Sequence, residues 1–183
     1  MKHYIFLAAL FISLFSIQAQ DNDVETTTND KHELKLNALY LVIGSFEVSY
    51  EYLLNEESGV GISVFLPFDD DIKDDLNYYV SPYYRFYFGN KYAAGFFLEG
   101  FGMLNSTNWY TLERQGELNP IFVERKETIT DFALGIGLGG KWITKRGLLG
   151  EVNFGVGRNL FNSNDFEDND FVGKIAITVG YRF

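Results

Sequence analysis

The sequence lacks several features that define common protein classes. Its 183 residues contain no cysteine, which excludes a disulfide scaffold and a lipid-anchored precursor. After residue 20 no apolar run approaches the ~20 residues of a membrane-spanning helix, so a helical membrane protein is also excluded. Proline occurs only 3 times and helix-favouring stretches are scarce, which leaves β-strands as the main expected elements.

Histidine is also scarce, with only His3 and His32 present. Barrel enzymes that act on lipid acyl chains need a His-centred catalytic set, because a neutral imidazole must take a proton from serine or water. His3 lies in a segment that we expect to be removed, and His32 lies at the inner start of the first expected strand. We therefore expect no enzymatic activity, and the sequence suggests no cofactor.

The residues that are abundant favour a membrane barrel. Aromatic residues make up 17% of the chain, with 18 Phe and 12 Tyr, and they are accompanied by 18 Gly. This composition suits strands with aromatic belts and closely packed positions. The formal net charge of −10 disfavours nucleic acid as a partner.

The N-terminal segment has the pattern of a secretory signal peptide. Lys2 is followed by an apolar run from Tyr4 to Ile17, and the small residue Ala19 marks a cleavage site. The expected organisation is a signal peptide at 1–19, a disordered leader at 20–32 and a single barrel domain at 33–183.

Alternation of apolar and polar residues predicts eight strands. They are expected at 33–43, 46–54, 59–68, 79–88, 93–104, 131–143, 148–158 and 172–183. The connections after strands two, four and six are short, and those after strands three, five and seven are long, as in outer-membrane barrels. We therefore predict an all-β fold, an eight-stranded antiparallel up-and-down transmembrane β-barrel. Both termini are expected in the periplasm, and strand eight is expected to pair with strand one.

The two faces of these strands differ in side-chain size. One face carries bulky apolar residues, including Leu36, Tyr40 and Val42, and is expected to face lipid, with Tyr78 and Tyr79 in the outer aromatic girdle. The opposite face mixes small residues with isolated charges, which suits the narrow interior of an eight-stranded barrel. Its charges are Lys35, Glu47, Glu51, Arg85, Glu99, Lys141, Glu151, Lys174 and Arg182.

Near-balanced charge on the inner face predicts a filled lumen. Unpaired charges in such a narrow space cost several kcal/mol, so an ion-paired network is favoured over an open pore. We expect Glu47, Glu99 and Lys174 toward the outer end and the other six toward the periplasmic end. A gated ion or proton path through the same network is the alternative.

The end of the chain resembles an outer-membrane assembly signal. Ile175, Ile177, Val179, Tyr181 and Phe183 share one face of the last strand, and the final residue is aromatic. This pattern resembles the C-terminal signal that barrel-insertion machinery reads.

Two acidic segments are weak candidates for cation binding. Asp69, Asp70 and Asp71 form one group, and Asp165, Asp168 and Asp170 form the other. Both could offer oxygen ligands to Ca²⁺, but neither has the ordered spacing and glycine of a dedicated loop. Solvated surface charge is the favoured interpretation, so no metal site is assigned.

The longest connection, 105–130, contains apolar residues. Ile121, Phe122 and Val123 are expected to extend strands five and six beyond the membrane as a β-hairpin. The alternative is a binding surface for a protein or glycan partner.

The expected mature chain resembles small outer-membrane β-barrel proteins of Bacteroidota. The resemblance rests on Lys35-Leu36-Asn37-Ala38-Leu39 up to Gly44, on Phe46 to Tyr52, and on the ending Val179-Gly180-Tyr181-Arg182-Phe183. The architecture is similar to OmpA-type and OmpX-type barrels, without the C-terminal peptidoglycan-binding domain of OmpA. The resemblance implies an outer-membrane location, and such relatives serve as adhesins, structural proteins and defence factors.

We expect a non-enzymatic integral outer-membrane barrel with a structural or surface-interaction role through its extracellular loops. Two alternatives remain: a narrow channel for ions or small solutes, and a lipocalin-like carrier with an apolar pocket. The expected partners are outer-membrane lipids, the barrel-insertion machinery and periplasmic chaperones, and the barrel is expected to be a monomer.

Overall fold

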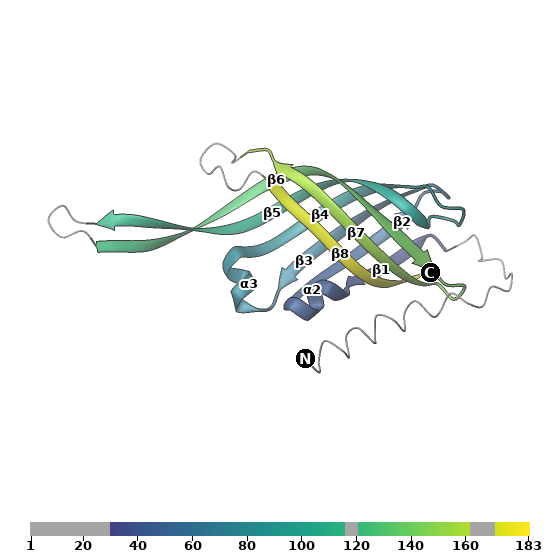
Figure 1. The fold of residues 1–183 in the computed structure, drawn as a ribbon, viewed down its shortest axis with the longest axis horizontal. Coiled ribbons are helices and arrows are strands. Elements are labelled where there is room, and N and C mark those ends of the chain that lie inside the picture. The colour runs from purple at the N-terminus through teal and green to yellow at the C-terminus, as the bar shows by residue number, and fades with distance from the viewer. Residues whose placement is uncertain (1–29, 116–120, 162–170) are drawn as a thin grey trace.

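The computed structural model describes residues 30–115, 121–161 and 171–183, with the backbone alone for 109–115 and 121–124. Within these residues, eight antiparallel strands form a closed barrel in sequence order (Figure 1). The strands are β1 (His32–Asn37), β2 (Ser45–Leu53), β3 (Ser58–Pro67), β4 (Leu76–Tyr87), β5 (Gly95–Gln115), β6 (Ile121–Ile143), β7 (Leu148–Asn159) and β8 (Phe171–Arg182). This architecture confirms the predicted all-β, eight-stranded up-and-down barrel. The expected signal peptide and most of the expected leader lie outside the described residues.

The barrel closes where β1 meets β8, as predicted. The pairing runs from Glu33 opposite Arg182 to Asn37 opposite Thr178. Beyond it, His32 and Phe183 exchange two backbone hydrogen bonds, of 3.0 and 2.8 Å. No strand edge is therefore left open along this stretch.

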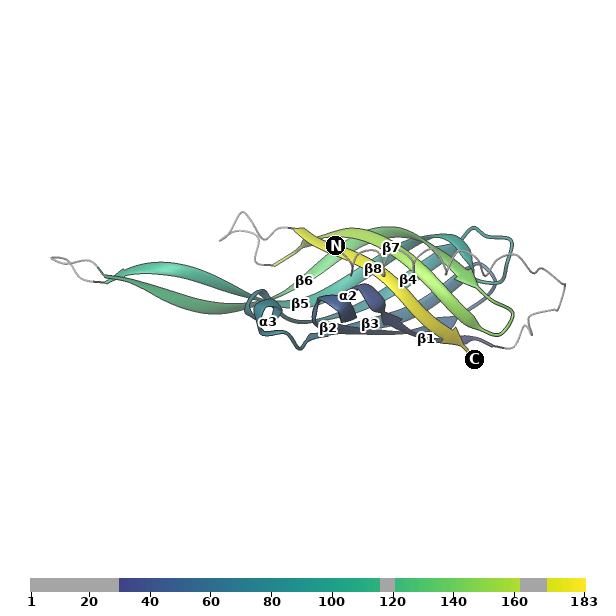
Figure 2. The same ribbon diagram turned by 60° about the horizontal axis from the view of Figure 1, so that its bottom comes forward.

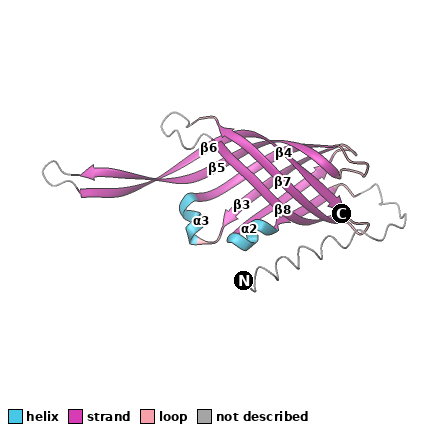
Figure 3. Ribbon diagram, viewed as in Figure 1, coloured by secondary structure: helices cyan, strands magenta, loops and turns pink. Residues whose placement is uncertain are grey.

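Two short helices interrupt the strand pattern: α2 (Ala38–Ile43) and α3 (Asp70–Asp75) (Figure 3). The prediction of a strand through residue 43 is therefore wrong from Ala38 onward. Asn37 caps the start of α2 with its side chain, and Gly44, at φ 100°, ends it in the left-handed conformation that glycine tolerates best. Within the described residues, no helix is long and apolar enough to cross a membrane.

The helix α2 replaces the outer part of β1. Pairing between β1 and β2 ends at Leu36 opposite Val48, whereas β2 itself continues to Ser45. On the other side, β8 begins at Phe171 but pairs with β1 only from Thr178. The helix contacts both β2 and β8 in this interval. The wall of the barrel is thus completed there by a helix instead of a strand.

Strands β5 and β6 extend well beyond the rest of the barrel. Their backbones pair continuously from Gly95 opposite Lys141 to Gln115 opposite Ile121. The neighbour β4 pairs with β5 only as far as Thr107, and β7 pairs with β6 only from Ala133. The predicted extension of strands five and six as a β-hairpin is therefore confirmed for the backbone, and the hairpin projects from one end of the barrel (Figures 1 and 2).

The two ends of the barrel are distinct. We call the end with the connections at 54–57, 88–94 and 144–147 the turn end; the C-terminus lies there (Figure 1). The opposite end, with α2, α3 and the hairpin, is the loop end. The strand order thus separates short turns from long connections, as the sequence predicted.

The outer face of the barrel is apolar. Large hydrophobic side chains from all eight strands are exposed on it, including Leu34, Val48, Val64, Phe86, Leu98, Ile136, Phe154 and Val179. Soluble monomers rarely expose so many large apolar side chains together.

The interior contains large aromatic residues that the sequence analysis did not place there. They are Phe65, Tyr79, Tyr83, Tyr87, Phe97 and Phe101, all almost fully buried. Tyr79 was expected in the outer girdle, and this assignment is wrong. Interior glycines make room for these rings, because a Cβ at Gly135 would lie only 2.3 Å from Cζ of Phe101. The small and the large inward residues are therefore complementary.

Candidate functional site

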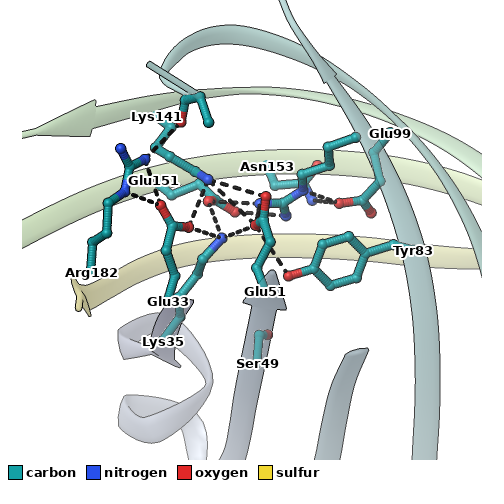
Figure 4. A network of polar contacts seen from close by, with 12 residues as sticks. Glu33, Lys35, Ser49, Glu51, Tyr83, Glu99, Lys141, Glu151, Asn153 and Arg182 are labelled. Carbon is teal, nitrogen blue, oxygen red and sulfur yellow. Dashed lines mark hydrogen bonds and ion pairs between the residues drawn. The ribbon is translucent and has the colours of Figure 1, made fainter. Parts of the chain in front are cut away.

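The centre of the lumen is filled by charged side chains. All nine charged residues that the sequence placed on the inner face are buried. Eight of them, together with Glu33, form a connected network that we call the ion-pair core, and Figure 4 shows its central part. Its members are Glu33, Lys35, Glu51, Arg85, Glu99, Lys141, Glu151, Lys174 and Arg182. Within the described residues, Glu47 is the one predicted residue that joins no ion pair.

Glu51 is the hub of the ion-pair core. Its carboxylate pairs with Lys35, with Nη1 of Arg85 at 3.0 Å and with Nζ of Lys141 at 3.3 Å. It also accepts hydrogen bonds from the hydroxyl groups of Tyr83, at 3.4 Å, and Tyr87. Glu51 is fully buried, so these partners replace all of its hydration.

Glu151 is a second carboxylate that joins Lys35 and Arg85, two of the cations that also contact Glu51. Its carboxylate lies 3.0 Å from Nζ of Lys35 and 2.7 Å from Nη2 of Arg85. The guanidinium of Arg85 also packs over the rings of Tyr83 and Phe97, at 4.4 and 4.3 Å from their centroids. Arg85 is thus held by both ionic and cation–π contacts.

Glu33 extends the core toward the turn end, and the sequence analysis missed it. Its carboxylate pairs with Lys35 at 3.1 Å, Lys141 at 2.8 Å and Arg182 at 2.6 Å. Period two from Lys35 places Glu33 on the same inward face, so the alternation could have identified it. With Glu33 and Glu47 counted, the buried lumen holds five cations and five glutamates.

Glu99 extends the core toward the loop end. It pairs with Nε of Arg85 at 2.7 Å and with Nζ of Lys174 at 2.8 Å, and it accepts a hydrogen bond from Asn153 at 3.1 Å. Glu99 therefore connects Lys174, which the sequence placed toward the outer end, with Arg85, which it placed toward the periplasmic end.

Nearly every buried polar group in the lumen has a partner. Among the described residues, only three buried side-chain atoms lack a hydrogen bond: Oγ of Ser45, Oγ of Ser81 and Oδ1 of Asn153. None of them is charged. A buried network that is satisfied in this way is stable as a unit, whereas the loss of one member leaves the others unpaired.

The turn end of the lumen is closed by apolar packing. Leu53, Tyr87, Ala93 and Phe97 form a buried cluster, and Tyr92 packs against it. The connection 88–94 is held in place by Arg182, which donates hydrogen bonds of 2.9 Å to the carbonyl oxygens of Tyr92 and Ala93. The same arginine therefore joins the ion-pair core to the closure of the turn end.

On the loop-end side of the core the lumen is lined mainly by neutral groups, with the buried acidic residues Glu47 and Asp131. The carboxylate of Glu47 accepts hydrogen bonds from Nδ2 of Asn37 at 2.5 Å and from the hydroxyl of Tyr79 at 2.8 Å. Asn37 also accepts hydrogen bonds from the backbone N–H groups of Leu39 and Ile177, at 3.1 and 3.3 Å. It thereby ties α2, β8 and Glu47 together where β1 ends.

A cavity of about 520 Å³ opens at the loop end. It is lined by Tyr40, Asp75, Leu76, Tyr79, Met103, Asn105, Thr107, Asn108, Val172 and Gly173. Tyr40 and Val172 pack against the buried aromatic cluster that includes Phe65, Tyr79 and Met103. The sequence placed Tyr40 on the lipid face, and this was wrong because the residue belongs to a helix that turns it inward.

The remaining candidate residues lie outside the lumen. Ile175, Val179, Tyr181 and Phe183 are exposed on the outer face of β8, and Ile177 on the same face is partly exposed. Asp69 caps α3 through a 3.0 Å hydrogen bond from the N–H of Asp71, and Asp70 pairs with Lys73 at 3.0 Å. In the described part of the chain, no three His, Asp or Glu side chains converge as metal ligands. Asp165, Asp168 and Asp170 lie outside the described residues.

Comparison with known proteins places the chain in a family. A family model described as a protein of unknown function (DUF3575) matches residues 5–179. This chain belongs to the DUF3575 family. No curated protein matches this DUF3575 member. Among solved structures, it is similar to the N-terminal β-barrel domain of Pseudomonas aeruginosa OprF, with a TM-score of 0.48 and 14% identity over 84% of this chain and 98% of that chain.

Proposed function

We propose that this DUF3575 protein is a non-enzymatic integral outer-membrane barrel with a closed lumen. In this proposal it anchors its loop-end elements at the cell surface, with both termini in the periplasm. Export would depend on the expected signal peptide at 1–19, and assembly would depend on the outward face of β8 from Ile175 to Phe183.

The observation that carries the proposal is the contrast between the two faces of the wall. Apolar side chains such as Val64, Ile136 and Phe154 are exposed on the outside, whereas Glu51 and Lys141 are fully buried inside. A soluble carrier would show the reverse, with an apolar interior and a polar exterior. The lipocalin-like alternative is therefore disfavoured, because lipid is the solvent that suits this outer surface.

A closed lumen is favoured over a channel because side chains fill successive levels of the barrel interior, starting from the turn end. The apolar cluster around Leu53 and Phe97 closes the turn end, and the ion-pair core follows it. Buried aromatic residues including Tyr83 and Phe101 come next. A solute would have to displace several mutually paired charges, each of which is costly to leave without a partner.

The β5–β6 hairpin is the element that supports a surface role. It projects beyond the barrel, where, among the residues that the structure describes, its two strands pair with each other and with no third strand. We propose that this hairpin, within the connection 105–130, is where a protein or glycan partner would bind.

Two measurements test the proposal. In cell fractionation we expect the full chain in the outer-membrane fraction, extracted only by detergent and with a heat-modifiable gel mobility. In planar bilayers we expect the folded protein to give no conductance steps. A soluble periplasmic pool would contradict the membrane assignment, and stable single-channel steps would contradict the closed lumen.

A further inference from the structure

The loop-end cavity differs in character from the lumen below it. The ion-pair core is filled by side chains that satisfy one another, whereas the cavity is open to the outside and has a volume of about 520 Å³. This volume is in the usual range for small-molecule sites, which are mostly apolar with a few directed polar groups. The lining follows that pattern, with Leu76, Met103 and Val172 beside Asn105 and Thr107.

The charge of this region is negative. Asp75 is the one charged residue among the lining residues, and it forms no ion pair with another described residue. Glu47 lies behind the wall, hydrogen-bonded to the lining residue Tyr79, and it is only 2% exposed. The nearby Lys174 is paired with Glu99, at 2.8 Å. Lys174 also attracts the carboxylate of Glu47. The cavity therefore has the carboxylate of Asp75 at its rim and no basic residue among its lining.

Aromatic rings add to the attraction for a cation. Tyr40 and Tyr79 line the cavity, and both contact Phe65, with ring centroids 5.2 and 4.8 Å away. Ring faces attract cations through their quadrupole, and this attraction increases where the site excludes water. Tyr79 is almost fully buried and one face of its ring is stacked on Phe65, so the partly exposed Tyr40 is the ring that a ligand can reach. Apolar surface, an aromatic ring and the carboxylate of Asp75 thus favour the same kind of ligand.

We infer that the loop-end cavity binds a small amphipathic organic cation, such as an amine or quaternary ammonium that carries an apolar group. The cationic group lies between Asp75 and the ring of Tyr40, and the apolar group packs against Met103 and Val172. This site is independent of the proposed role of the β5–β6 hairpin.

The chain offers a site-specific probe for this inference. It contains only two methionines, Met1 and Met103, and Met103 lines the cavity. Methyl-¹³C-methionine labelling of the full chain, folded in lipid nanodiscs, therefore gives one methyl signal from the barrel. Titration with phenyltrimethylammonium is expected to shift this signal saturably, with a Kd on the order of 1 mM or below.

Matched variants and ligands distinguish the cause of the shift. Asp75→Asn is expected to raise the Kd about two- to fivefold, because it removes the charge at the rim. Asp71→Asn makes the same charge change on the same helix, away from the lining, and is expected to leave the Kd unchanged. Val172→Trp is expected to abolish the saturable shift by filling the cavity, while a heat-modifiable gel shift verifies that this variant folds.

Three outcomes would overturn the inference. The first is the absence of a saturable shift. The second is equal or tighter binding of neutral benzyl alcohol or anionic benzenesulfonate, which would show that charge does not select the ligand. The third is an equal loss of affinity in Asp71→Asn and Asp75→Asn, which would show a general surface effect.

Discussion

Glu47 and Glu51 lie four residues apart on the same inward face of β2, yet their surroundings differ. Glu51 contacts three cations and two tyrosine hydroxyl groups. Glu47 is bonded to the neutral side chains of Asn37 and Tyr79 instead. Both are almost fully buried, with exposed fractions of 0% and 2%. Burial alone therefore does not tell which carboxylate stabilises the barrel.

The difference follows from how the wall is built at the two levels. Near Glu51 all neighbouring strands are present, and β1, β4, β6 and β7 direct Lys35, Arg85, Lys141 and Glu151 to one point. Near Glu47, β1 has already ended at Asn37 and α2 takes its place. The turn-end half is thus a filled, charge-paired plug, and the loop-end half is an aromatic layer, in which Glu47 is held by neutral partners, below an open cavity.

The largest predicted effect comes from the hub of the ion-pair core. We expect Glu51→Gln to lower the free energy of unfolding by about 3–5 kcal/mol, because it leaves Lys35, Arg85 and Lys141 short of a buried counter-charge. Urea unfolding in lipid vesicles, followed by tryptophan fluorescence and gel mobility, measures the change.

Glu47→Gln is the matched control on the same strand. Its amide can keep a hydrogen bond with Tyr79, and among described residues it breaks no ion pair, so we expect a change within about 1 kcal/mol. If Glu47→Gln lowered the free energy of unfolding as much as Glu51→Gln, the distinction between the two halves of the lumen would be wrong.

A smaller effect is expected from the packing of the aromatic layer. In Gly135→Ala the new Cβ would lie 2.3 Å from Cζ of Phe101 and 2.7 Å from the carbonyl oxygen of Val156. We expect this overpacking to cost about 1–3 kcal/mol in the same unfolding measurement.

The control for this variant is Gly100→Ala, on the outer face of β5. A Cβ at Gly100 meets no atom within 4 Å, so the substitution should be neutral or slightly stabilising. If Gly135→Ala were as well tolerated as Gly100→Ala, the interior would not be packed as the structure shows.

The smallest effect is expected from the hairpin. We expect the barrel to tolerate deletion of residues 110–126 with Trp109 joined to Glu127 through Asn-Gly. In the described part of the chain, this part of β5 and β6 pairs with no other strand. The exposed pair of Lys126 and Asp74 is lost, so the free energy of unfolding should fall by less than about 1 kcal/mol. A loss as large as that of Glu51→Gln would show that the hairpin supports the barrel.

Alternation in the sequence was sufficient to predict the strands and the inward charges, because both depend on a local property. Side chains of a strand point to opposite faces with period two, whatever lies across the sheet. Lys35, Glu51 and Arg182 could therefore be placed inside the barrel. The same rule would have placed Glu33 and Tyr83 there, had it been applied to every strand without favouring small residues.

The helix α2 shows why part of the fold was missed. Residues 38–43 are apolar and were assigned to a strand, but the flanking Asn37 and Gly44 are a helix start and a helix end. These two residues were the available signal. That the helix directs Tyr40 into a cavity depends on the positions of β2 and β8, so the local sequence does not predict it.

The sequence by itself determined that this protein forms an eight-stranded antiparallel barrel with a charged interior and an apolar exterior, because period two fixes which side chains face inward. Only the tertiary structure decided which charges meet. Closure of the barrel brings Arg182 of β8 to Glu33 of β1, and Lys141 of β6 to Glu51 of β2. Strand tilt and stagger set these contacts across the lumen, and they are properties of the whole closed sheet.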